Sequence, residues 1–188
     1  MFSHSWFSSR YRPSHKHHRP NQKYQHKTFN KKENNKKEKN PNHAQAIVIG
    51  ASTGGPPIVE EIISLLPSNL EPVIFIAQHM PKQFTESFAE RLGKIAKIKI
   101  FEAFDGQKIE SGCCYLAPGN ADMTIVKRGN FIKAVITQET SEEGLHPSIN
   151  ILMTSVADCY KDKTVGIILT GMGDDGHVGA RVIKENGG

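Results

Sequence analysis

The chain has 188 residues, enough for one domain of ordinary size. Its formal net charge of +5 is uneven, because residues 1–45 hold eleven Lys and Arg against two Glu (+9), whereas residues 46–188 hold thirteen against seventeen Asp and Glu (−4). The composition therefore excludes a basic, nucleic-acid-binding surface on the main domain, and the absence of a run of about 18 apolar residues excludes an integral membrane segment.

Residues 1–45 form a polar segment rich in Asn, Lys, His, Gln and Ser, and the stretch KKENNKKEKN contains no apolar side chain. Such a segment cannot bury enough surface to offset its ordering entropy, so we predict a disordered basic tail that serves as a solvated linker. Two other roles are less common for such a tail: adhesion to nucleic acid or lipid, and metal binding by His15, His17 and His18. No signal peptide is recognisable, and we expect a cytoplasmic protein.

Short apolar strands and amphipathic helices alternate from residue 46 onward. In chain order, the first predicted elements are a strand over 46–49, a helix from 56 to 66, a strand over 73–77, a helix around 84–95 and a strand over 98–101. Proline suits the first helical turn, so Pro56 and Pro57 mark the start of the first helix, and Pro67 ends it.

The second half continues this alternation after an insertion of short strands. Residues 105–138 are predicted to form strands and turns, with a hairpin signal at Arg128-Gly129-Asn130. Then follow a helix to about Tyr160, a buried strand over 165–169, a glycine-rich turn and a last helix over 178–185. The pattern predicts an α/β fold: a doubly wound, mostly parallel sheet with helices on both faces and a β-hairpin insertion. The ending Asn-Gly-Gly resembles a helix C-cap, so we expect the domain over 46–188 to be incomplete at its C-terminus.

The stretch VIGASTGGPP, residues 48–57, admits three kinds of glycine-rich turn. A P-loop needs Lys after its last glycine, where this chain has Pro56. A dinucleotide-binding turn needs G-x-G-x-x-G, which is missing, as is the Tyr-x-x-x-Lys pair of short-chain dehydrogenases. The pattern G-x-S-x-G is present over Gly50–Gly54 between a strand and a helix, and this is the context of a nucleophile elbow that exposes Ser52. A plain tight turn is the alternative.

Candidate partners for Ser52 follow two other strands. Only three histidines lie outside the tail, and His79 comes directly after the second strand; Asp174 and Asp175 follow the strand near residue 168. Because the carboxyl ends of parallel strands meet at one edge of a sheet, we expect a Ser–His–Asp triad there. A structural histidine and a solvated acidic turn or metal site are the alternatives. Three cysteines without C-x-x-C spacing indicate neither a disulfide framework nor a zinc site.

Five blocks in order make the assignment more specific: GASTGGPP, IAQHMP with FTESFAERL, YLAPGN, HPSINIL and ILTGMGDDG. Together they resemble the chemotaxis protein-glutamate methylesterase family, the CheB catalytic domain, over residues 46–188. The resemblance implies that Ser52 is the nucleophile, that His79 is the general base and acid, and that Asp175, rather than its neighbour, orients the histidine. It further implies an oxyanion surround at Thr53 and Met172.

The resemblance also implies the reaction and the partners. The reaction is hydrolysis of γ-glutamyl methyl esters on methyl-accepting chemotaxis receptors, with release of methanol, and members often also deamidate receptor glutamines. Arg91 lies in the helix that the family presents toward its substrate. We expect a monomer that needs no metal and no organic cofactor.

Three departures from the family pattern leave a second hypothesis open. We expect the phosphorylation-receiver domain of the family to be absent, because residues 1–45 are too few and too polar to form one. His146 and Asn150 stand where members carry Arg and Asp, and we expect members to continue beyond the position of Gly188. The second hypothesis is an inactive, truncated fragment that only binds a receptor or another partner. A dinucleotide-binding oxidoreductase is a third hypothesis, disfavoured by the missing motifs.

Overall fold

The computed structural model describes residues 44–138 and 145–188, so the predicted tail, apart from residues 44 and 45, lies outside the described residues. The elements in chain order are β1 (Ala46–Ala51), α1 (Gly55–Leu65), β2 (Val73–Gln78), α2 (Lys82–Ile95), β3 (Lys99–Glu102), β4 (Cys113–Leu116), β5 (Asp122–Arg128), β6 (Phe131–Thr137), α3 (Ile149–Tyr160), η2 (Lys161–Lys163), β7 (Thr164–Ile168) and α4 (His177–Glu185).

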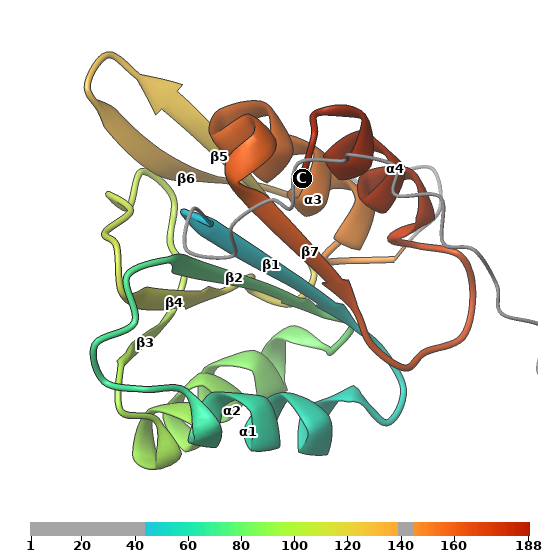
Figure 1. The fold of residues 1–188 in the computed structure, drawn as a ribbon. Helices are drawn as coiled ribbons and strands as arrows, with labels where there is room; N and C mark the ends of the chain where they lie inside the picture. Colours follow the sequence, from blue (N-terminus) through green and yellow to red (C-terminus); the bar gives the residue numbers. More distant parts are fainter. Residues whose placement is uncertain (1–43, 139–144) are drawn as a thin grey trace, which may run out of the picture. The chain divides into compact units, whose positions relative to one another are not determined.

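Five strands form one parallel sheet in the order β3-β4-β2-β1-β7 (Figure 1). Helices α1 and α2 cover one face; α3, α4 and the antiparallel β5–β6 hairpin lie on the other (Figure 1). The predicted α/β fold class with its hairpin insertion is therefore confirmed. Strand β1 lies between β2 and β7, where the chain changes from building one side of the sheet to the other, and ligands bind beyond the strand ends at such a point.

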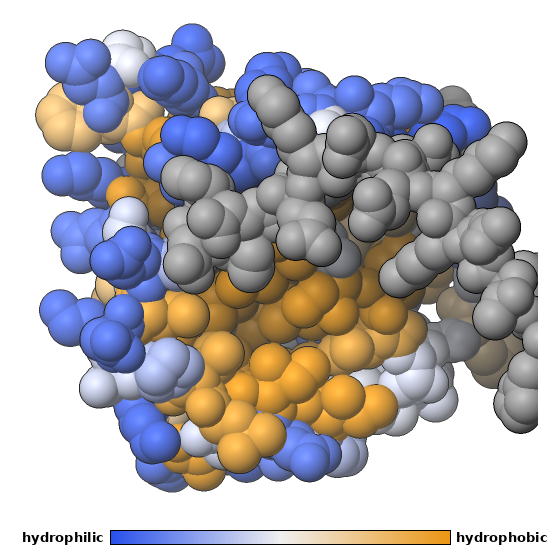
Figure 2. All heavy atoms as spheres, in the orientation of Figure 1, coloured by the Kyte–Doolittle hydropathy of each residue, from blue (hydrophilic) through white to orange (hydrophobic). Residues whose placement is uncertain are grey.

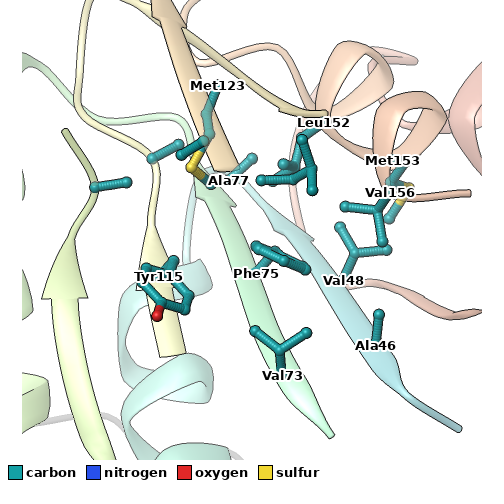
Figure 3. Packing of buried hydrophobic residues seen from close by; sticks show 14 of the residues in the cluster. Ala46, Val48, Val73, Phe75, Ala77, Tyr115, Met123, Leu152, Met153 and Val156 are labelled. Carbon is teal, nitrogen blue, oxygen red and sulfur yellow. The ribbon is translucent and has the colours of Figure 1, made fainter. Parts of the chain in front are cut away.

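Alternate side chains of the strands enter two separate cores, because successive residues of a strand point to opposite faces. On the α3 side, Val48 and Phe75 pack with α3 residues, which Figure 3 shows close to the sheet. The members labelled from α3 are Leu152, Met153 and Val156. On the opposite side, Ile49 and Ile76 pack against α1 and α2. Both faces of β1 are thus buried, which holds its carboxyl end rigidly in place.

Strand β7 corrects one prediction. We expected a buried strand over 165–169, but β7 is an edge strand with β1 as its single partner among the described residues, and Val165 and Ile168 are 42% and 47% exposed. A short apolar run looks alike in a central strand and in an apolar edge strand, so the pattern could not distinguish them. Figure 2 shows a hydrophobic surface in the region where Figure 1 places β7 and α1.

The described residues contain no helix that is long and apolar enough to cross a membrane. In the same part of the chain, no group of three or more His, Cys, Asp or Glu side chains is placed to hold a metal ion.

Candidate active site

Three loops meet at the carboxyl edge of the sheet and carry the residues singled out in the sequence. They follow β1, β2 and β7, and main-chain hydrogen bonds join them beyond the strands. The Ser52 N–H donates to the Thr170 carbonyl at 3.0 Å, and the His79 N–H donates to the Ala51 carbonyl at 2.9 Å. The three loops are therefore held together as a continuation of the sheet.

Small residues allow the turn at Ser52. Gly54 has a φ of +77°, a left-handed conformation that favours glycine, and the Gly55 N–H closes the turn on the Ser52 carbonyl at 2.9 Å. The loop after β7 comes equally close, since a Cβ at Gly171 would lie 2.5 Å from the Ser52 Cβ. Because Gly54 and Gly171 have no side chains, Ser52 fits between its own turn and the loop after β7.

Ser52, His79 and Asp175 are brought together as the sequence predicted. The His79 Nδ1 lies 3.0 Å from the Ser52 Oγ, and the His79 Nε2 lies 2.8 Å from the Asp175 Oδ2. The histidine side chain is 11% exposed and the aspartate side chain 2%. The carboxylate can only accept, so Nε2–H donates to it, and Nδ1 is left with a lone pair that accepts the Ser52 hydroxyl proton. This is the hydrogen-bond pattern of a nucleophile, a base and an orienting carboxylate.

Asp175 is held at the N-terminus of α3. Its carboxylate accepts the N–H groups of Ile149 at 2.7 Å and Asn150 at 2.8 Å, and the Ser148 hydroxyl donates to it at 3.3 Å. Burial alone would raise the pKa of Asp175, but the hydrogen bonds from His79 and from the helix N-terminus outweigh it and hold this pKa below its ordinary value. The carboxylate is therefore charged at neutral pH.

A second carboxylate supports this arrangement, and our sequence analysis missed it. Asp122, buried at the start of β5, accepts the Ser148 N–H at 2.7 Å, and Ser148 in turn caps α3 through the Ile151 N–H. His146 Nδ1 lies 3.1 Å from the same Asp122. His146 is thus packed beside Asp122 inside the protein, and neither of its ring nitrogens makes a hydrogen bond among the described residues. A serine just before an apolar helical run was the only local signal for this cluster.

Of the remaining predicted site residues, Thr53 and Met172 lie close to Ser52, whereas Arg91 lies elsewhere. Met172 is 81% exposed beside Ser52, and Thr53 is also exposed. Within the described ranges, the main-chain N–H of neither residue donates a hydrogen bond. Arg91 is not brought to the triad: it lies on α2, and its guanidinium pairs with Glu60 of α1 at 2.8 Å.

A hollow of about 50 Å³ opens beside the nucleophile, and we call it the Ser52 hollow. It is lined by Gly50, Ala51, Ser52, His79, Ile149, Ile168, Leu169, Thr170, Gly171, Met172, Gly173 and Asp175. A larger cavity of about 680 Å³, which includes Gln45 and Gly112, contains none of the triad residues. Of these two, the smaller one offers a position for a reacting carbonyl next to Ser52.

The parallel α/β sheet and the hydrogen-bonded Ser–His–Asp group at its carboxyl edge together define the architecture of a serine hydrolase. A protein-family model described as CheB methylesterase matches residues 47–188, and the chain belongs to that family.

Named relatives and a solved structure agree with this assignment. A protein-glutamate methylesterase/protein-glutamine glutaminase of Nitratidesulfovibrio vulgaris is 42% identical over 142 residues, and one of Methanococcus maripaludis is 42% identical over 144. Each alignment covers 76% of this chain and 39% of the relative, so the chain spans about two fifths of the length of these relatives. The crystal structure of the Thermotoga maritima CheB methylesterase catalytic domain superposes with a TM-score of 0.74 at 36% identity, covering 77% of each chain.

Proposed function

We propose that this chain hydrolyses γ-glutamyl methyl esters on methyl-accepting chemotaxis receptors and releases methanol. The observation that carries the proposal is the continuous line of hydrogen bonds from Ser52 through His79 to Asp175. The names of the relatives supply the substrate class, a glutamate methyl ester or a glutamine within a protein.

The first half of the reaction forms an ester on the serine. The Ser52 Oγ attacks the ester carbonyl carbon while the His79 Nδ1 takes the hydroxyl proton. The carbonyl oxygen becomes an oxyanion. Its proposed donors are the main-chain N–H groups of Thr53 and Met172, which make no hydrogen bond with the described residues. The carbon–methoxy bond then breaks, and the proton on His79 leaves with methanol.

The second half restores the enzyme. A water molecule gives one proton to His79 and adds its oxygen to the glutamyl–serine carbonyl, after which the bond to the Ser52 Oγ breaks and His79 returns the proton to that oxygen. Asp175 stabilises the imidazolium in both halves and stays ionised. A receptor glutamine would follow the same path with ammonia as the leaving group, which accounts for the second activity in the names of the relatives.

The remaining inferences concern the oligomeric state, the compartment and the contact with the protein substrate. All three triad side chains come from one chain, so we propose that a monomer suffices. The three cysteines are free, as expected in a reducing, cytoplasmic compartment. Arg91, exposed on α2 beside Glu60, stays a predicted contact to the protein substrate. The hypothesis of an inert binding fragment gains no support from this geometry.

The test is methanol release from membranes that carry methylated receptors, with Ser52→Ala as the variant. Its matched control is Ser64→Ala, because Ser64 is partly exposed on α1 and its hydroxyl bonds only the Glu61 carbonyl among the described residues. We expect release by the wild-type chain and by the control, and a loss of at least about 10³-fold in Ser52→Ala. Equal release by all three proteins would refute serine chemistry at Ser52, and no release by a folded wild-type chain would refute the proposed activity.

A further inference from the structure

Asn150 occupies an unusual position between the two helices that meet at Asp175. It is the second residue of α3, and its amide Oδ1 accepts two hydrogen bonds from another helix, the Gly176 N–H at 3.0 Å and the Gly179 N–H at 2.8 Å. These donors belong to the first turn of α4, whose N-cap is Gly176. A glycine has no side chain with which to cap its own helix, so Asn150 supplies the missing acceptor from α3.

Asp175 in turn caps the N-terminus of α3. Its carboxylate accepts the N–H groups of the first two residues of α3, one of which is Asn150 itself. Thus residue 150 holds the first turn of α4, and residue 175, shortly before α4, holds the first turn of α3. This reciprocal capping fixes the carboxylate from two sides: through its own oxygens and through the main chain of its neighbour Gly176.

The packing of the two helices makes this contact possible. A Cβ at Gly179 would lie 2.5 Å from the Met153 Cβ and 3.2 Å from the Asn150 carbonyl oxygen, so α4 rests directly on α3 at this point. No bulkier residue would let the Gly179 N–H reach the Asn150 amide. The short distance between helices is therefore matched to the length of the asparagine side chain.

We propose that Asn150 is a positioning residue that sets the direction of the Asp175 carboxylate toward His79. The inference rests on the proposed hydrolase function. Asn150 does not line the Ser52 hollow, so it acts on the rate through Asp175 and not through substrate contact. In the described part of the chain, Asp175 is the only charged group in hydrogen-bond contact with His79, so the Asp175 position decides how well the imidazolium is stabilised. The next carboxylate, Asp122, lies 3.1 Å from the His146 Nδ1 and is linked to Asp175 only through Ser148.

The decisive variants are Asn150→Ala and Asn150→Asp. Alanine removes the acceptor, while aspartate keeps an oxygen there and suits a helix N-terminus electrostatically. The matched control is Asn186→Ala, because Asn186 also bonds the main chain of α4 through its side chain but lies at the other end of that helix. Methanol release gives kcat and KM, and the low-field NMR signal of the His79 Nε2–H reports the bond to Asp175 without any turnover.

We expect Asn150→Ala to lower kcat by about 10- to 100-fold, with KM within about twofold of wild type, and to move the Nε2–H signal upfield. Asn150→Asp should have the kcat and the Nε2–H signal of the wild type, and Asn186→Ala should change neither kcat nor the signal. A folded Asn150→Ala protein that keeps the kcat and the signal of Asn186→Ala would overturn the proposal.

Two further outcomes would also test the proposal. If Asn150→Ala does not fold, Asn150→Ser takes its place, because a serine hydroxyl at this position is too short to reach both α4 donors; an unchanged signal in that variant would also overturn the inference. If the wild-type chain releases no methanol, the proposed function fails, while the NMR comparison still decides whether Asn150 positions Asp175.

Discussion

At the scale of single residues, Asp175 is the most heavily constrained side chain of the site. Its two oxygens accept hydrogen bonds from His79, Ile149, Asn150 and the Ser148 hydroxyl. Three of these bonds come from the N-terminal turn of α3, which favours a negative charge. The carboxylate therefore both fixes the direction of the His79 ring and stabilises the protein through its charge.

Asp175→Asn should lower kcat by about 10⁴-fold, because a neutral amide cannot hold the imidazolium and can reverse the histidine tautomer. The variant should also lose a pH-dependent part of its stability. The pKa of Asp175 is lowered in the folded state, so its contribution is fully present above the unfolded value of about 3.9 and is lost as pH falls through the folded value.

Urea unfolding followed by circular dichroism at pH 7 and near pH 3 measures that part. The wild type should have a larger free energy of unfolding than Asp175→Asn at pH 7. The difference between the two proteins should be smaller near pH 3. A gap of equal size at both values would show that the charge of Asp175 does not contribute to folding.

At the scale of elements, the loop after β7 must lie flat against the end of β1. Gly171 makes this possible, since a Cβ there would overlap the Ser52 side chain. The loop also brings Met172 and Asp175 to the site. One residue without a side chain thus decides how closely the loop after β7 approaches Ser52.

Gly171→Ala should therefore separate these two loops and lower kcat/KM by about 10²-fold, while the core of the sheet stays intact. Gly93→Ala is the matched control, because a Cβ at Gly93 on α2 meets nothing within 4 Å. It should keep full activity and gain about 0.5–1 kcal/mol in stability. The measurements are methanol release and thermal unfolding; unchanged activity in Gly171→Ala would mean that the loop tolerates displacement.

The elements also show how far sequence reasoning reaches. Strand ends and the G-x-S-x-G turn are local patterns, so the fold class and the meeting of Ser52, His79 and Asp175 could be predicted. The support from Asp122 could not, because its contact with Ser148 spans 26 positions and depends on how the hairpin packs on α3. The Asn150 contacts and the exposed edge of β7 likewise depend on tertiary placement, which periodicity does not encode.

At the scale of the whole domain, the site depends on its least protected strand. β7 pairs on one side only among the described residues, and two of its five residues are large, exposed hydrophobics. The central strands are buried on both faces and paired on both sides. Local opening takes place where burial is poorest, so β7 and the loop that carries Asp175 should open before the rest of the sheet.

Urea should consequently abolish hydrolysis at a lower concentration than it abolishes the helical signal at 222 nm. The loss of hydrolysis reports the separation of Asp175 from His79. The loss of the signal at 222 nm reports the unfolding of α1, α2 and the central sheet. Both are measured on the same samples at one temperature. Coincident midpoints would instead show that β7 opens only together with the whole domain.

The wide separation of the triad along the chain also has a consequence in time. His79 and Asp175 are 96 positions apart, and synthesis proceeds at about 5–20 residues per second, so the histidine is made roughly 5 to 20 s before its carboxylate partner exists. Throughout that interval the nascent polypeptide carries a serine and a histidine with nothing to orient the imidazole. A newborn copy on the ribosome therefore lacks the carboxylate of the proposed triad, and the Ser52–His79–Asp175 group is complete only when β7 joins the sheet.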